Sequence, residues 1–177
     1  SKTDSIVITG TFGEILTYNS KTIGAQSNTT EKGFISYRNS SATQYTQDEA
    51  FNHQADIDMF CFYENTATSV NMMTLAAPGS NIKGIFTGAT SPELYTVKNV
   101  TFFVKTTLTA AQFDAVTNDA VIRASFDPTK QFKKAKLLTA GDVYSFKLQS
   151  GKYGLLKVIA VAGAEAGTLQ IAVKIQK

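Results

Sequence analysis

The sequence predicts a mainly β protein, an antiparallel β-sandwich that carries two short helices. Apolar runs separated by short glycine turns fill residues 137–177. In the last run Leu169, Ile171, Val173 and Ile175 alternate with polar residues, which predicts a strand with one buried face and one face in water. No strand–helix–strand repeat with long crossovers is present, and this argues against a parallel α/β fold.

The N-terminal region is expected to be rich in loops. The run Ile6-Val7-Ile8 before Gly10 predicts a first strand. Residues 33–37 predict a second strand, and the polar stretch 26–32 predicts a surface loop between the two. Residues 1–5 are polar and are typical of a mature terminus or a linker remnant, so we expect a signal peptide or a lipid-modified cysteine upstream.

A capping box predicts the first helix, over residues 47–53. Thr46 is followed three residues later by Glu49, and each side chain can satisfy a backbone N–H group of the first helical turn. Residues 55–63 then alternate and predict a central strand with one polar end. Its two expected faces hold Ile57, Met59, Cys61 and Tyr63 on one side, and Asp56, Asp58, Phe60 and Phe62 on the other.

The middle of the chain predicts a hairpin, another strand and the second helix. Residues 70–75 are the expected hairpin partner and end in a type II turn over 77–80, where Pro78 presets φ and Gly79 takes a positive φ. Residues 99–106 predict a strand. The box Thr109–Gln112 then starts a helix that is expected to end near Asn118. The remaining strands are expected near 136–138, 143–148, 153–161 and 168–175.

Composition limits the classes of function. The 177 residues are 43% hydrophobic and are expected to form one domain over 1–177. Only 18% are charged, and the polarity supplied by Ser, Thr, Asn and Gln is typical of an extracytoplasmic protein. A net charge of +3 from 17 basic and 14 acidic residues predicts no nucleic-acid partner. The single cysteine, Cys61, lies among apolar residues and is expected in the core.

Several segments resemble those of uncharacterised secreted lipoproteins of Bacteroidetes. The resemblance implies a location in the periplasm or on the outer cell surface, near glycan-utilisation machinery, with membrane contact only through an N-terminal lipid anchor. It implies no established activity and brings no functional residues. The segments are GDVYSFK at 141–147, SGKYGLLKV at 150–158, IAVKIQ at 171–176, DEAFN at 48–52, IDMF at 57–60 and TLTAAQFD at 107–114.

Acidic residues form the strongest chemical grouping in the sequence. Paired carboxylates can bind a metal ion or divide the acid and base roles of a hydrolase. Asp56 and Asp58 are the weak metal candidates, and they combine with Glu64 or His53 in the hydrolase hypothesis. Structural roles are favoured, because Asp48 and Glu49 already belong to a helix start. Asp58, inside an apolar strand, must lie at an edge, be hydrogen-bonded or have a shifted pKa.

Lysines and tyrosines are the candidate binding residues. Lys130, Lys133, Lys134 and Lys136 surround Phe132 and can grip an acidic polysaccharide or a phosphate-bearing surface, or form a solvated edge. Four tyrosines lie in regions where rings can stack on sugars, although half-buried packing is their alternative role. They are Tyr18, Tyr37, Tyr45 and Tyr95.

The sequence favours a non-enzymatic extracytoplasmic module that binds a glycan or a surface protein through its loops and needs no cofactor. No nucleophile elbow, phosphate loop, HExxH or CxxC motif is present. The first alternative is the carboxylate hydrolase. The second is a structural subunit of a surface assembly, which would expose an unpaired strand edge or an apolar patch. The oligomeric state is left open.

Overall fold

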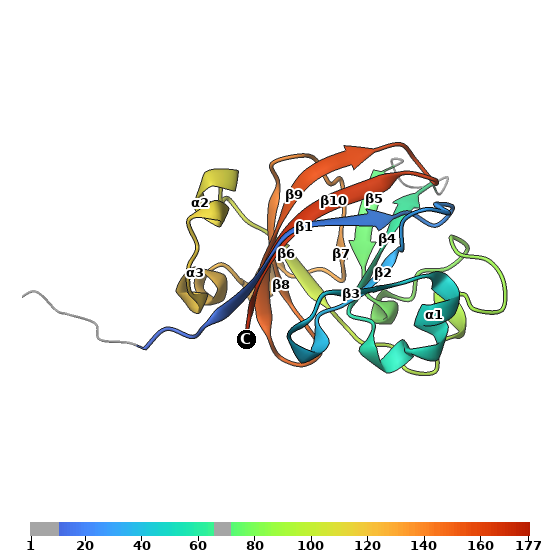
Figure 1. Ribbon diagram of the computed structural model, residues 1–177, viewed down its shortest axis with the longest axis horizontal. Coiled ribbons are helices and arrows are strands. Elements are labelled where there is room, and N and C mark those ends of the chain that lie inside the picture. Colours follow the sequence, from blue (N-terminus) through green and yellow to red (C-terminus); the bar gives the residue numbers. More distant parts are fainter. Residues whose placement is uncertain (1–10, 66–71) are drawn as a thin grey trace, which may run out of the picture.

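Two five-stranded antiparallel sheets form the body of the protein, so the predicted fold class is confirmed (Figure 1). The computed structural model describes residues 11–65 and 72–177. Sheet A has the order β1-β10-β9-β8-β6, and sheet B has the order β3-β2-β4-β5-β7. The strands of sheet A are β1 Ile15–Gly24, β6 Phe102–Lys105, β8 Val143–Lys147, β9 Tyr153–Ala162 and β10 Thr168–Gln176, and those of sheet B are β2 Phe34–Ser36, β3 Thr43–Tyr45, β4 Met59–Glu64, β5 Met72–Ala76 and β7 Lys134–Ala135.

The two sheets pack face to face around a shared apolar core. Met59 and Cys61 of β4 meet Phe146 of β8 and Val173 of β10 in one buried cluster. Alternation explains the arrangement, because every second side chain of a strand points to the same face. Cys61 is fully buried as predicted, and burial raises the pKa of its thiol far above the ordinary value.

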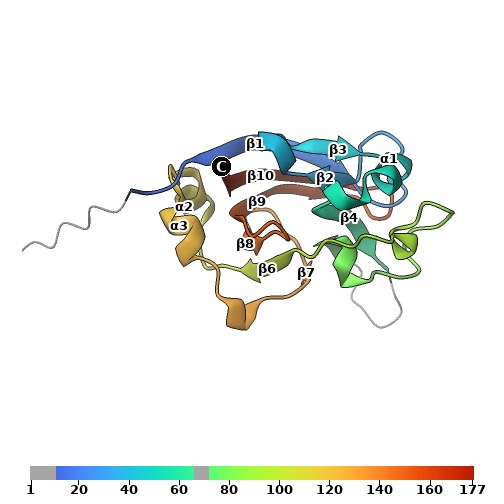
Figure 2. The same ribbon diagram turned by 90° about the horizontal axis from the view of Figure 1, so that it is seen from below.

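Within the described residues, three short helices lie at the two ends of the fold: α1 Gln47–Asn52 at one end, and α2 Ala110–Asp114 and α3 Asp119–Ala124 at the other (Figure 2). Both predicted capping boxes are present. The second predicted helix, α2, ends at Asp114 and not near Asn118. α3 was not predicted; it starts after Asn118, which takes an extended conformation and whose side chain accepts from the N–H of Ala120 at 3.0 Å. None of the helices in the described residues is long and apolar enough to span a membrane. Single 3-10 turns cover Arg38–Ser40, Gln54–Asp56, Pro78–Ser80, Pro92–Leu94 and Pro128–Lys130.

The expectation that one face of β10 lies in water is wrong at its C-terminal half. Ala172 and Lys174 are buried beneath α2 and α3, in contact with a second apolar cluster that includes Phe113. The ammonium of Lys174 donates to the carbonyls of Asp114 at 2.8 Å and Val116 at 2.6 Å. Lysine is tolerated there because its stem packs on apolar surface while its head satisfies carbonyls at a helix end.

The N-terminal region contains a long strand that the sequence analysis missed. β1 pairs along its length with β10, and the register shifts between Tyr18 and Lys21. This bulge at Asn19-Ser20 breaks the period of two, so the sequence shows no clean alternation. The predicted strand at Ile6-Val7-Ile8 lies outside the described residues. The predicted loop at 26–32 and the following strand, β2, are observed.

Three boundaries in the middle of the chain differ from prediction. Residues 54–56 form a 3-10 turn, β4 begins at Met59, and Ile57 joins the cluster on the outer face of sheet B. The turn at 77–80 is also 3-10, because Asn81 rather than Gly79 takes the positive φ, of 54°. Gly79 is needed for close approach, since a Cβ there would lie 2.5 Å from a methyl carbon of Val100 and 2.9 Å from the carbonyl oxygen of Asn99. The strand expected at 136–138 lies at Lys134–Ala135.

Candidate functional site

One segment, residues 131–135, pairs with both sheets, and we call it the strap. Phe132 exchanges backbone hydrogen bonds with Phe103 of β6, at 2.8 and 2.9 Å. Two residues later Lys134 and Ala135 pair with β5 of sheet B. Because backbone bonds hold both ends, the strap places its side chains on a rigid edge of the sandwich.

A groove of about 700 Å³ lies along the strap, and we call it the lysine groove. Phe132 projects beside it with 71% of its surface exposed. The lining consists of five lysines and three aromatic residues: Lys105, Lys130, Lys133, Lys134, Lys136, Phe103, Phe132 and Tyr144.

Glu64 at the end of β4 holds two of these lysines. Its carboxylate lies 3.0 Å from the ammonium of Lys134 and 3.3 Å from that of Lys136. Burial raises the pKa of Glu64, but the hydrogen bonds and charges of the two lysines outweigh it and leave that pKa below the ordinary value. The two ammonium groups are thereby held on one side of the strap.

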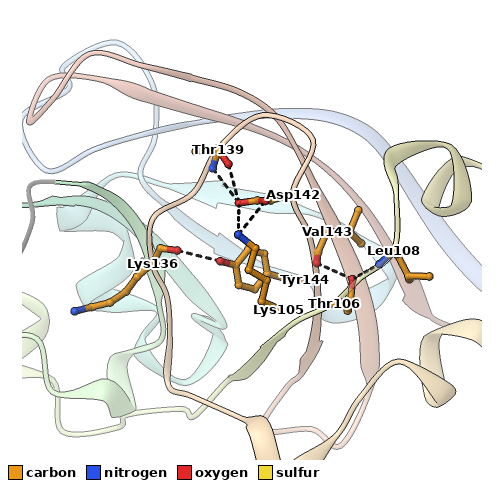
Figure 3. Close-up of polar contacts among 8 residues, drawn as sticks. All are labelled: Lys105, Thr106, Leu108, Lys136, Thr139, Asp142, Val143 and Tyr144. Carbon is orange, nitrogen blue, oxygen red and sulfur yellow. Dashed lines mark hydrogen bonds and ion pairs between the residues drawn. The ribbon is translucent and has the colours of Figure 1, made fainter.

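Asp142 positions the fifth lysine, Lys105, as Figure 3 shows. The ammonium of Lys105 lies 3.0 Å from the Asp142 carboxylate, which also accepts from the N–H of Thr139 at 3.2 Å and from its hydroxyl at 3.0 Å. The hydroxyl of Tyr144 donates to the carbonyl of Lys136 at 3.0 Å, which ties the groove floor to the residue after the strap. Burial, together with the charge of Asp142, raises the pKa of Tyr144 to about 12, so the phenol is neutral.

The lysine groove keeps an excess of positive charge. Lys130 lies 3.3 Å from Asp127, and both side chains are exposed. Lys133 has no ion-pair partner among residues 11–65 and 72–177. Five ammonium groups therefore meet three carboxylates, of Glu64, Asp142 and Asp127. Sequence reasoning found four of these lysines and Phe132, whereas Lys105 and Tyr144 join only through the register of β6 with β8.

The structure does not bring the four candidate tyrosines together. Tyr37 and Tyr95 are buried, so neither offers an open ring face. Half-buried Tyr18 packs against Tyr37, with ring centroids 5.7 Å apart. Tyr45 packs against His53 at 5.0 Å, near α1. Lys133 and Lys134, the candidate lysines, both line the lysine groove.

Among the candidate acids, Asp56 lies beside His53, and Glu64 lies apart from both at the end of β4. Asp56 lies 3.5 Å from Arg38 and 3.6 Å from His53, whereas Asp58 accepts from the N–H of Tyr37. Glu64 lies six residues beyond Asp58, roughly 20 Å along an extended chain. Glycosidase carboxylates lie about 5–10 Å apart, so this pair has no hydrolytic geometry. Within the described part of the chain, no three His, Cys, Asp or Glu side chains gather to hold a metal ion.

Comparisons with known proteins support the fold. No protein-family model and no curated protein matches the sequence. Among solved structures, the chain is similar to a DUF4466 family protein from Parabacteroides merdae, with a TM-score of 0.65 and 14% sequence identity. The match covers 92% of this chain but only 54% of the other, so the chain spans about half of that protein's length. At this identity the likeness shows the fold alone: the chain shares its architecture with a protein from the Bacteroidetes whose family has no known function.

Proposed function

We propose that the protein is a non-enzymatic, extracytoplasmic binding module that holds an acidic glycan in the lysine groove. The observation that carries the proposal is the exposed ring of Phe132 among five lysines on a strap fixed to both sheets. Ammonium groups attract carboxylate or sulfate groups, and an aromatic face packs on the apolar C–H surface of a sugar ring.

The charge distribution supports a glycan rather than a nucleic acid. The whole chain has a net charge of only +3 and contains two arginines, Arg38 and Arg123. Nucleic-acid binding requires a broader basic surface that contacts many phosphates. A short acidic glycan needs only a few ammonium groups and one ring, which matches the groove.

The location is part of the proposal. Polarity from uncharged side chains, the low fraction of charged residues and the resemblance to Bacteroidetes lipoproteins all favour the periplasm or the outer cell surface.

Isothermal titration with polygalacturonate and chondroitin sulfate, with neutral dextran as the control, tests the function. Lys133→Gln is expected to weaken binding about fivefold, the equivalent of about 1 kcal/mol for one exposed charge. The matched control is Lys83→Gln, which changes an exposed lysine outside the groove. Phe132→Ser is expected to cost about 1–2 kcal/mol, and Phe12→Ser serves as its control because Phe12 is also exposed.

Salt provides a further criterion. Affinity for the acidic glycans is expected to fall as ionic strength rises, because exposed charges are screened beyond about 10 Å at 0.1 M salt. Equal binding of dextran and the acidic glycans, or full binding by Lys133→Gln and Phe132→Ser, would contradict the proposal.

A further inference from the structure

A second groove, of about 670 Å³, lies on the outer face of sheet A, and we call it the ring groove. Phe102, Lys147 and Tyr153 are direct cross-strand neighbours on β6, β8 and β9. Their neighbours in sequence, Phe103 and Phe146, point into the shared core, so these three side chains point outward. The wall opposite comes from α3 and the segment that follows it.

Aromatic rings form one corner of the ring groove. The rings of Phe126 and Tyr153 meet edge to face, with centroids 5.2 Å apart and an angle of 69° between their planes. Both side chains and Phe102 are half-buried, so each presents part of its surface to the groove. The ammonium of Lys147 lies 5.3 Å from the centroid of the Tyr153 ring. This corner has the size and chemistry to pack against a six-membered sugar ring.

Arg123 supplies a positioned cation at the same groove. Its Nε donates to the carboxylate of Asp119 at 2.6 Å. Asp119 is buried and also accepts from the N–H of Gly13 at 2.7 Å and from the amide of Gln176 at 2.9 Å, so its orientation is fixed. The rest of the guanidinium extends outward, with 66% of the Arg123 side chain exposed. Its terminal nitrogens have the fork geometry that binds a carboxylate through two hydrogen bonds.

The lining carries no charge that opposes an anion. Arg123 and Lys147 are its ionised residues, and no Asp or Glu lines the ring groove in the described part of the chain. The amide of Gln131 adds a neutral donor and acceptor of the kind that binds sugar hydroxyls. Aromatic faces, an amide and two cations in one groove fit an acidic sugar better than a neutral sugar or an apolar peptide.

We propose that the ring groove binds a uronic acid residue, with its pyranose ring against Phe126 and Tyr153 and its carboxylate at Arg123. This site is separate from the lysine groove, shares none of its lining residues, and does not depend on the function proposed above. It adds a second site for an acidic sugar, with two cations in its lining where the lysine groove has five.

Titration of the folded protein with trigalacturonic acid, followed by NMR, tests this inference. Backbone signals near Tyr153 and Arg123 are expected to shift on binding, and the methyl ester of the same trisaccharide is expected to bind about tenfold more weakly because it lacks the carboxylate charge. Arg123→Lys keeps the charge but loses the fork, so it is expected to weaken binding severalfold. Phe126→Ala is expected to abolish it, with a thermal melt to show that the variant is folded.

Two sets of signals keep the two proposals distinguishable. Lys133→Gln should leave the shifts at Tyr153 unchanged, because Lys133 belongs to the lysine groove. Shifts confined to Phe132 and Lys133, equal binding of acid and ester, or unchanged binding by Arg123→Lys and a folded Phe126→Ala would each overturn the uronate site. Shifts at Tyr153 alone would support it and count against the lysine groove.

Discussion

The carboxylate of Asp58 accepts a hydrogen bond from the backbone N–H of Tyr37 at 2.7 Å, inside the protein. Asp58, the residue before β4, is only 3% exposed, and this hydrogen bond joins it to the turn after β2. Two of the following residues, Asn39 and Ser40, take positive φ values of 52° and 57°. The bond therefore anchors a turn whose backbone is strained. A hydrogen bond, an edge position or a shifted pKa was expected for this residue. The hydrogen bond is observed, and burial raises the pKa of the carboxyl group.

Asp58→Asn is expected to stabilise the protein at neutral pH. Burial raises the pKa of Asp58 to about 6, partly offset by the Tyr37 hydrogen bond and the charge of Arg38. The folded state thus holds its proton more tightly than the unfolded state, so stability falls as pH rises from about 4 to 6. Asparagine keeps an acceptor for Tyr37 without the charge, and its gain at pH 7 is expected on the order of 2 kcal/mol.

Urea denaturation of both proteins at pH 4 and at pH 7 measures this effect. The advantage of the Asp58→Asn variant should grow with pH, and Asp48→Asn, at an exposed site, serves as the control. A variant that is less stable than the parent at pH 7 would show that the ionised carboxylate stabilises the fold.

Glu64→Gln is expected to move stability and affinity in opposite directions. The free energy of unfolding should fall by about 1–3 kcal/mol, because Lys134 and Lys136 lose their carboxylate partner. Anion affinity at the lysine groove should rise, because one opposing charge is removed. Denaturation and titration with polygalacturonate measure the two effects, and weaker binding by a folded variant would show that Glu64 mainly orients the lysines.

Gly154→Ala is expected to destabilise sheet A. A Cβ at residue 154 would lie 2.2 Å from the ring of Phe146, which is fully buried on the neighbouring strand. Overpacking of this kind costs about 1–3 kcal/mol. Thermal unfolding measures the loss, with exposed Ser150→Ala in the preceding turn as the control. An unchanged melting temperature would mean that Phe146 can move aside.

Asn118→Ala is expected to loosen α3 by removing its cap, with a loss of about 0.5–2 kcal/mol. Because α3 carries Arg123 into the ring groove, binding of trigalacturonic acid should weaken as well. Asn19→Ala in the β1 bulge makes the same chemical change at an exposed site and should have little effect. Loss of stability without any loss of binding would show that α3 does not depend on its cap to place Arg123.

Signals confined to a few residues were predicted correctly. Both capping boxes depend on residues three positions apart, and the alternation of Leu169, Ile171, Val173 and Ile175 follows directly from the geometry of one strand. Features that depend on distant partners were missed. β1 is held by β10 across a bulge, and no local pattern reveals that pairing.

The residues of the two grooves were likewise predicted only where they lie close together in the sequence. Lys133 and Lys134 were identified because lysines cluster around Phe132 in the sequence, whereas Lys105 reaches the lysine groove only through strand pairing. The ring groove combines residues from β6, α3, β8 and β9, so no single segment contains its pattern. Tyr37 and Tyr95 were predicted as binding residues although both are buried, because residue type alone does not show how far a side chain lies from the surface.

The strap has a mechanical consequence for the whole molecule. Since one short segment is bonded to both sheets, separating the layers on that side means breaking its bonds to β6 and to β5 together. A ligand that binds the strap in the folded protein is therefore expected to stabilise the fold against unfolding. Its binding should raise the melting temperature, and the rise should increase with ligand concentration. A rise in melting temperature can thus serve as a screen for compounds that bind the strap.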